Sequence, residues 1–388
     1  MEKKFKFIDL FAGIGGFHEA MVNLGGECVL ASEIDQFAIE SYKENYGIDS
    51  AHDITKIKYE DVPDHDVLCA GFPCQPFSKA GAQEGFADQT KGTLFFQICR
   101  ILKAKQPKYI FLENVRNLVS HDHGKTFKVI VEALDELGYQ LTKEPLICSP
   151  HQLGVPQLRE RVYILGVNKK YLDKPVEVEM PHFEGKLDIY TSGIFETEPV
   201  DKKYYISKHQ EMVLNAWDEF YHGIKEKVIG FPIWSFEFRE TYNYEDDTIP
   251  GWKQNFIKKN REMYQNNKEF IDGWFKKYKD LKDFTPTEQK FEWQAGTKID
   301  TLWEGFIQFR PSGIRVKKPD SFPALVAMVQ IPIVGRFKRR LTPREAARLQ
   351  SFPDSFIPNK NDQQAYKQFG NAVNVNCIEY FAKQLLKY

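Results

Sequence analysis

Short apolar runs alternate with helical repeats along residues 5–167, and this alternation limits the chain to few folds. Apolar runs at 5–10, 28–31, 67–70 and 109–112 have the length of buried strands, and each is followed by a stretch of helical periodicity. A last run at 161–167 predicts one more strand. Strands that alternate with helices in this way form a mostly parallel sheet with helices on both faces. The sequence therefore predicts an α/β fold.

The chain changes character after residue 172. All six tryptophans lie between positions 217 and 303, where strand–helix alternation fades, and residues 253–282 have the pattern of a charged helical insertion. We expect most aromatic residues of this region to form a hydrophobic core of their own. A loop-and-helix pattern returns from Tyr366. The predicted organisation is a larger domain at 1–172, completed by 364–388, and a second, smaller domain at 173–363.

A glycine-rich stretch, Phe11-Ala12-Gly13-Ile14-Gly15-Gly16-Phe17, follows the first predicted strand and begins a helix. Glycines let the backbone turn tightly and approach a ligand closely, although such a stretch can also be an ordinary turn. Glu33 follows the second strand, where an acid can hold ribose hydroxyls, and Asp53 can accept a hydrogen bond from an adenine amino group. The pattern predicts an adenosine-containing ligand. Glu19 stands where a dinucleotide motif has its third glycine, which disfavours a nicotinamide oxidoreductase.

Cys74 lies between two prolines directly after the third predicted strand, in Gly71-Phe72-Pro73-Cys74-Gln75-Pro76-Phe77-Ser78. An isolated cysteine is commonly inert, and the other five cysteines, without paired or ligand-like spacing, fit that description and a reducing compartment. Glu113 ends the next strand. Because the carboxyl ends of parallel strands meet at one edge of a sheet, Cys74 and Glu113 are predicted to share a crevice with the adenosine ligand. A thiol and a carboxyl group in one crevice indicate a reactive site.

Gln157, Arg159 and Arg161 precede and open the last predicted strand of this part. Alternate side chains of an extended segment point the same way, so the three are predicted to face the same crevice. One amide and two guanidinium groups suit an anionic or carbonyl-bearing substrate. The alternative is that both arginines pair with Glu160 at the surface.

Two segments concentrate positive charge in a chain whose formal net charge is only −1. Residues 310–318 contain four basic residues and no acid, and residues 336–348 contain six basic residues and one acid. Each segment is either a solvated face or a nucleic-acid surface. No apolar run approaches the ~20 residues that span a bilayer, and no signal-peptide cleavage site follows the basic start. We therefore expect a cytoplasmic protein without a membrane partner.

Taken in order, these motifs resemble those of the DNA (cytosine-5)-methyltransferases. The resemblance rests on Phe-x-Gly-x-Gly-Gly, Gly-Phe-Pro-Cys-Gln-Pro-Phe-Ser, Glu-Asn-Val, Gln-x-Arg-x-Arg and Gln-Phe-Gly-Asn-Ala-Val, with a further matching block at 341–353. It covers residues 1–170 and 336–388, and the segment between them is the part that reads the target sequence in this family. The resemblance implies a Rossmann-like, S-adenosylmethionine-dependent methyltransferase domain with a smaller target-recognition domain.

The resemblance implies S-adenosylmethionine as the cofactor, S-adenosylhomocysteine as its product, and no metal. Two positions depart from the family pattern: Ala372 replaces a frequent serine and Leu158 replaces a usual basic residue. These departures put in doubt one side-chain contact to the cofactor and one to a phosphate. The implied cofactor-binding residues are Phe11, Gly13, Ile14, Gly16, Glu33, Ile34, Asp53, Ile54, Pro73, Leu94, Asn371 and Val373.

The resemblance also implies that Cys74 attacks carbon 6 of a flipped-out cytosine, so that carbon 5 can accept the methyl group. Protonated Glu113 would hydrogen-bond ring nitrogen 3 and the exocyclic amino group, and Arg161 would bond oxygen 2 with Arg159 close by. Ser78 begins a loop that we expect to close over the flipped base. The remaining DNA-binding candidates are Gln157, Arg310 and Arg315.

Two other functions were compared with this one. An RNA (transfer-RNA) cytosine-5 methyltransferase would carry Cys-Phe-Thr in its recognition region, and this chain has no such triplet. A catalytically inactive DNA-binding protein is disfavoured because Cys74, Glu113 and Arg161 are all present. The expected function is methylation of a short site in double-stranded DNA, within a restriction-modification system. We expect a monomer that acts beside a cognate restriction endonuclease.

Overall fold

The computed structural model describes residues 4–73, 94–226, 228–325 and 331–388. The chain forms two compact units. The first unit comprises Met1–Leu187, Pro323–Val329 and Pro343–Tyr388, and the second comprises Asp188–Phe322 and Gln330–Thr342.

Residues 173–187 and 343–363, which the sequence placed in the second domain, belong to the first unit. The backbone N–H group of Glu177 donates a hydrogen bond of 2.9 Å to the hydroxyl of Tyr388, which ties the segment after residue 172 to the end of the chain. Helix α8 (Pro343–Leu349) buries most of its side chains although three arginines lie in or near it. Its apolar face, rather than its charge, decides which unit it joins.

The sheet of the first unit is rich in parallel strands, which confirms the predicted α/β fold. Its strands are β1 (Phe5–Leu10), β2 (Gly26–Ser32), β3 (Val67–Gly71), β4 (Tyr109–Val115), β5 (Tyr139–Leu141), β6 (Leu146–Cys148) and β8 (Arg161–Asn168). Their order is β2-β1-β3-β4-β8-β5, with β6 also paired to β8; the first four are parallel to one another, whereas β8 pairs antiparallel to its neighbours. The short strands β5 and β6 were not predicted, because three residues are too few for a periodic signal.

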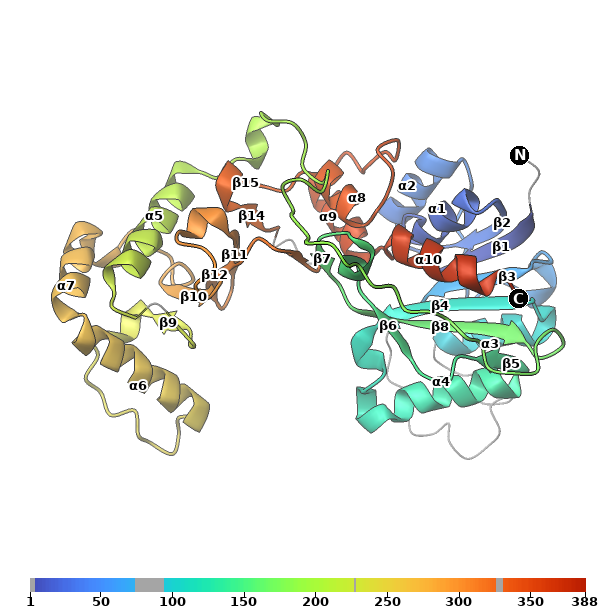
Figure 1. The fold of residues 1–388 in the computed structure, drawn as a ribbon, viewed down its shortest axis with the longest axis horizontal. Helices are drawn as coiled ribbons and strands as arrows, with labels where there is room; N and C mark the ends of the chain where they lie inside the picture. The colour runs from blue at the N-terminus through green and yellow to red at the C-terminus, as the bar shows by residue number, and fades with distance from the viewer. Residues whose placement is uncertain (1–3, 74–93, 227, 326–330) are drawn as a thin grey trace. The chain divides into compact units, whose positions relative to one another are not determined.

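Helices cover both faces of this sheet (Figure 1). The helices are α1 (Gly16–Asn23), α2 (Gln36–Tyr46), α3 (Leu94–Lys105), α4 (Lys125–Glu136), α9 (Asp362–Asn371) and α10 (Val375–Leu385). Apolar side chains of α3 and α4 pack with alternate residues of β1, β3, β4 and β8 in one core. On the other face α1 meets β4 through Phe17 and Phe111, and α10 meets β8 through Phe381 and Tyr163. The carboxyl ends of β1 to β4 are left open at one edge.

The second unit is built on another sheet, of order β15-β14-β11-β12-β10-β9. Its strands are β9 (Ile233–Trp234), β10 (Lys290–Gln294), β11 (Phe306–Arg310), β12 (Gly313–Lys317), β14 (Ile333–Val334) and β15 (Arg339–Arg340). Its helices are α5 (Lys208–Gly223), α6 (Gly251–Asn266) and α7 (Lys268–Lys277), of which α6 and α7 fill the predicted helical insertion. Two further short strands, β7 (Gln157–Leu158) and β13 (Phe322–Pro323), lie outside both large sheets.

Aromatic rings form the core of the second unit. Trp217 is fully buried and stacks on Phe291 with ring centroids 4.8 Å apart, and Trp274 packs beside it at 5.3 Å. The indole N–H of Trp217 donates to the carbonyl of Glu288, so its polar edge is satisfied inside the core. The prediction of an aromatic core is therefore confirmed, whereas Trp252 is 62% exposed.

Two kinds of feature are absent from the described residues. No helix there is long and apolar enough to cross a membrane. Likewise, no group of three or more His, Cys, Asp or Glu side chains in this part of the chain could hold a metal ion.

Candidate active site

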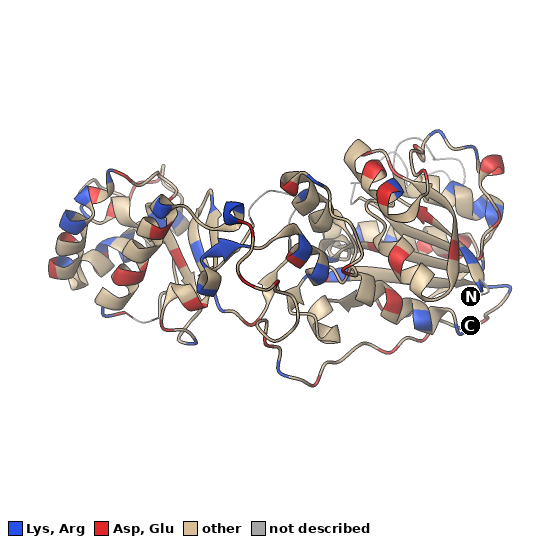
Figure 2. Cartoon of the chain, turned by 90° about the horizontal axis from the view of Figure 1, so that it is seen from above, with Lys and Arg blue, Asp and Glu red and all other residues tan. Residues whose placement is uncertain are grey.

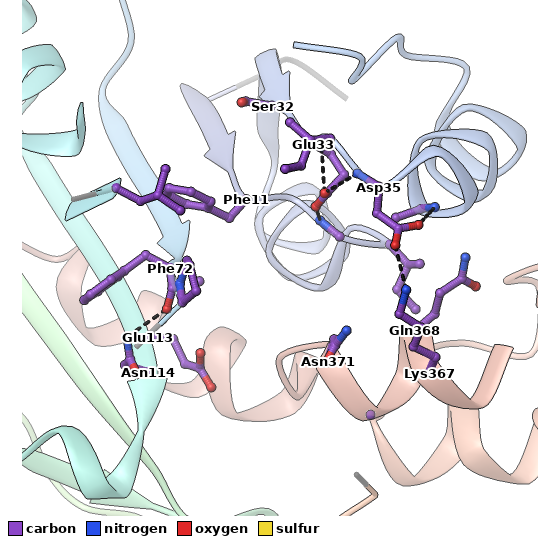
Figure 3. A pocket seen from close by; sticks show the side chains of 18 of the residues that line it. Phe11, Ser32, Glu33, Asp35, Phe72, Glu113, Asn114, Lys367, Gln368 and Asn371 are labelled. Carbon is purple, nitrogen blue, oxygen red and sulfur yellow. Dashed lines mark hydrogen bonds and ion pairs between the residues drawn. The ribbon is translucent and has the colours of Figure 1, made fainter. Parts of the chain in front are cut away.

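A pocket of about 470 Å³ lies at the open edge of the first unit's sheet, where β1 to β4 end. Figure 3 shows side chains from both ends of the chain around it. The sequence-predicted residues that line it are Phe11, Gly13, Ile14, Glu33, Ile34, Asp53, Ile54, Pro73, Leu94, Glu113, Arg159, Arg161 and Asn371. The predicted convergence of strand ends thus brings the adenosine candidates and the chemical candidates into one space.

The glycine loop between β1 and α1 has an unusual backbone. Phe11, Gly13 and Gly15 have φ angles of 56°, 55° and 86°, a region that glycine adopts without steric cost. A Cβ atom on Gly15 would lie 2.3 Å from the ring of Tyr46, so only glycine fits there. Gly13 has no atom within 4 Å of where its Cβ would be, which leaves its backbone open to a ligand.

Glu33 joins the glycine loop to the start of α2. Its Oε2 atom accepts a hydrogen bond of 2.8 Å from the N–H of Gly13, and Oε1 accepts from the N–H groups of Ile34 (2.7 Å) and Asp35 (2.9 Å). These three donors fix the carboxylate at the pocket wall. Because each carboxylate oxygen has further acceptor capacity, the group can also hold ribose hydroxyls.

Another part of the pocket lining combines an acid with apolar side chains. Asp53 accepts hydrogen bonds from the N–H (2.9 Å) and hydroxyl (2.7 Å) of Thr55, and these bonds lower the pKa of Asp53, which keeps it ionised. Ile54 is buried beside it, whereas Ile34 is 73% exposed. An exposed isoleucine beside fixed carboxylates suits a ligand with a flat apolar ring and a polar sugar.

The C-terminal segment closes the pocket. Lys367 on α9 forms an ion pair of 2.8 Å with Asp35, which also caps α2, and the Gln368 amide nitrogen donates to the carbonyl of Phe37. Two predicted cofactor residues, Gly16 and Val373, do not line the pocket. Val373 lies behind the glycine loop, 2.6 Å from where a Cβ atom of Gly16 would be, so this pair sets the spacing of the loop. Sequence reasoning missed Lys367 and Asp35, although Lys367 directly precedes the Gln-Phe-Gly-Asn motif.

Glu113 is the buried acid of the pocket. It is 7% exposed on β4 and pairs with Arg161, with 3.1 Å between Oε1 and the guanidinium Nε. Burial raises the pKa of Glu113 although Arg161 and Arg159 oppose this. The neighbouring Asn114 donates from its amide to the carbonyl of Phe72 (2.8 Å), which fixes the end of β3 beside Glu113. A buried carboxyl group with a raised pKa can act as a proton donor.

The three residues predicted to face the crevice do not all line the pocket. Arg159 and Arg161 line the pocket, but Gln157 is fully buried away from it, because the strand is interrupted between β7 and β8. The alternative, in which both arginines form ion pairs with Glu160, is also wrong. The carboxylate of Glu160 pairs with Arg116 instead, at 2.6 Å.

Four predicted residues lie elsewhere in the chain. Cys74 and Ser78 are outside the described residues, although Pro73, the residue before Cys74, lines the pocket. Arg310 and Arg315 belong to β11 and β12 of the second unit.

The fold and the pocket define a class of protein: an α/β enzyme with a site for an adenosine-containing cofactor beside a buried acid. The model of the C-5 cytosine-specific DNA methylases matches residues 5–387. Type II methyltransferase M.AluI of Cellulosimicrobium cellulans is 34% identical over 98% of this chain and 92% of its own length. Type II methyltransferase M.HpaII of Haemophilus parainfluenzae is 36% identical over 100% and 90%. The Dnmt2 methyltransferase of S. pombe has a similar fold, with a TM-score of 0.54, 20% identity and 99% coverage of both chains.

The chain therefore belongs to the C-5 cytosine-specific DNA methylase family. It is a methyltransferase for carbon 5 of cytosine in DNA, and the family uses S-adenosylmethionine as methyl donor. This confirms the resemblance found in the motifs.

Proposed function

We propose that this enzyme methylates one cytosine within a short duplex DNA site, through a covalent adduct with Cys74, as the modification enzyme of a restriction-modification system. One observation supports this most directly: the pocket that holds the cofactor candidates also contains buried Glu113, paired with Arg161 at 3.1 Å. Pro73, which precedes Cys74 in the sequence, also lines this pocket. A cofactor cradle and a base-binding acid in one pocket are what methyl transfer to a base requires.

The residues present fit S-adenosylmethionine. Glu33 would hold the ribose, Ile34 and Ile54 would pack on the adenine, and Asp53 would accept from its amino group. The open backbone at Gly13 would allow close approach of the amino-acid part. When bound, this cofactor supplies a methyl group on a positively charged sulfur, an electrophile that needs an electron-rich carbon.

Cys74 would make carbon 5 electron-rich. Its thiolate forms a bond to carbon 6 of the cytosine, and protonated Glu113 donates a hydrogen bond to nitrogen 3, where the ring's negative charge develops. Arg161 donates to oxygen 2. The electron pair at carbon 5 takes the methyl group as the methyl–sulfur bond breaks, which leaves S-adenosylhomocysteine. A base then removes the carbon 5 proton, and the carbon 6–sulfur bond breaks to release Cys74.

The second unit would act as the target-recognition domain. Arg310, Arg315 and Lys317 lie on one face of its sheet. The strand register places Gln308 and Glu292 opposite Arg315 on either side, and Arg310 and Lys317 each lie two residues along their strand from Gln308 and Arg315. Burial, with the positive charges of Arg315 and Arg310, lowers the pKa of Lys317. Cations held this close together suit a polyanion such as the DNA backbone.

Arg315 is the best candidate in that group for a base contact. Glu292 holds its Nε and Nη2 atoms at 2.8 Å, which orients the guanidinium and leaves Nη1 for a ligand. A good bidentate contact discriminates between bases by about 1–3 kcal/mol. Elsewhere in this unit acidic and basic side chains are interspersed along the helices (Figure 2), which is typical of a solvated surface. A monomer beside a cognate endonuclease stays part of the proposal.

Trapping the adduct tests the proposal. Duplex DNA made with 5-fluorocytosine should form a complex with the enzyme that survives SDS electrophoresis, because fluorine does not leave carbon 5 as the proton does. The complex should form only when S-adenosylmethionine is present. Cys74→Ala should abolish the complex, and Cys99→Ala, a buried thiol on α3, should retain it. Transfer RNA carrying the same base analogue should give no complex. An adduct with Cys74→Ala would disprove the nucleophile assignment, and bisulfite sequencing of exposed DNA would identify the site.

A further inference from the structure

Arg159 lines the pocket, but its hydrogen bonds go to the backbone of distant segments. The side chain is only 3% exposed. Nη1 donates to the carbonyl of Leu325 (3.0 Å), and Nη2 donates to the carbonyls of Gly370 and Ala372 (both 2.9 Å). These three bonds occupy Nη1 and Nη2, whereas Nε is buried without a hydrogen-bond partner among the described residues.

The two carbonyls that share Nη2 flank Asn371, a residue at the pocket wall and a candidate for the cofactor site. One nitrogen atom of Arg159 therefore fixes the peptide group that precedes Asn371 and the one that follows Ala372. A lysine could not reproduce this, because its ammonium is a point charge without the planar fork of a guanidinium.

Arg159 also lines the same pocket as Glu113, the proposed base-binding acid. Arg161 follows two residues later and pairs with Glu113, and the positive charge of Arg159 also favours the ionised form of Glu113. The Ser149 hydroxyl accepts from the N–H of Arg159 at 2.8 Å, so the backbone here is held as well. Burial, with the charge of Arg161, lowers the pKa of Arg159 to about 9, so it still carries its charge at neutral pH.

We propose that Arg159 is a positioning residue that couples the cofactor site to the base site. A cofactor that contacts Asn371 would order residues 370–372, their carbonyls would order Arg159, and Arg159 would set the Glu113–Arg161 pair for the flipped cytosine. This rests on the proposed function. It predicts that cofactor and DNA strengthen each other's binding, and that the link passes through one side chain.

The coupling can be measured directly. The dissociation constant of S-adenosylhomocysteine is determined by calorimetry with and without a duplex that carries the site found by bisulfite sequencing. For the wild type we expect the duplex to tighten binding by a factor within the usual range for coupled sites, about 5- to 150-fold. Arg159→Lys should reduce this factor to near one. Arg344→Lys is the matched control, because Arg344 also bonds backbone carbonyls, of Pro353 and Phe356, but away from the pocket.

The outcomes separate the possibilities. An Arg159→Lys variant that melts earlier yet keeps the wild-type coupling factor would make Arg159 merely structural and overturn the inference. If Arg159→Lys fails to fold, Asn371→Ala replaces it, since removal of the cofactor end of the link should abolish coupling while Arg159 stays bonded; retained coupling would again overturn it. Absence of both coupling and fluorocytosine adduct in the wild type would instead refute the proposed function.

Discussion

The two units of this methyltransferase bury carboxyl groups in different surroundings. In the second unit the buried Glu237 accepts hydrogen bonds from Tyr242 (2.7 and 2.9 Å) and pairs with Arg261 (3.4 Å), and the tryptophan N–H groups bond to carbonyls. In the first unit Asp9 is fully buried, and burial raises its pKa well above the ordinary value. Glu113 likewise stays buried with a raised pKa although it pairs with Arg161. Hydrogen bonding of a buried acid serves stability, whereas a buried acid with a raised pKa at the pocket, such as Glu113, suits proton donation.

The strongest test of this contrast is a substitution that creates a cavity in the core of the second unit. Trp217→Ala should lower the free energy of unfolding of that unit by about 3–5 kcal/mol, because a large fully buried ring is removed. If the first unit holds the cofactor by itself, S-adenosylhomocysteine affinity should change by less than about twofold below the melting temperature. Calorimetric melting and titration measure both quantities. Trp252→Ala, at an exposed ring, is the control, and a large loss of cofactor affinity with Trp217→Ala would contradict the division of roles.

Glu113→Gln should sharpen the contrast from the other side. Loss of the protonated carboxyl group should lower kcat by about 10²–10³-fold, in the range for loss of one transition-state donor. Affinity for S-adenosylhomocysteine should stay within about threefold of the wild type. Because the pKa of Glu113 is raised and its protonated form is required, wild-type kcat should fall as pH rises through that pKa. Single-turnover methylation across pH would show this limb, and its persistence in the glutamine variant would assign the titration to another group.

The last prediction concerns Asp9, and its effect depends on pH. Burial, with the negative charge of Glu33, raises the pKa of Asp9 well above its ordinary value, so the folded protein binds this proton more tightly than the unfolded chain does. The stability that Asp9 contributes is complete below its unfolded pKa of about 4 and is lost as pH rises through the folded pKa, by at most about 1.4 kcal/mol per pH unit. Asp9→Asn should therefore gain stability relative to the wild type as pH increases from 5 to 8 in urea titrations. Parallel curves for the two proteins would mean that folding does not raise the pKa of Asp9.

Local patterns predicted much of the first unit and little that depends on distant pairing. β1 begins and ends where the sequence placed it, because an apolar run is recognised within a few residues. The glycine loop and Glu33 were likewise recognisable from their positions after strands. The ion pair of Asp35 with Lys367 joins residues 332 positions apart, and no period or motif indicates such a partner. The burial of Gln157 was missed for a related reason, since an assumed continuous strand is interrupted after residue 158.

The C-terminal segment gives the enzyme a dependence on the order of synthesis. A ribosome makes the glycine loop and Glu33 well before it makes Lys367, Gln368 and Asn371, which close the same pocket. A growing chain that has already made both sheets still lacks one wall of its cofactor site. Domains generally begin to fold during synthesis, from the N-terminus onward. If this pocket is the cofactor site, as proposed, cofactor binding requires that translation has passed residue 371, and a chain truncated before it would have no complete pocket.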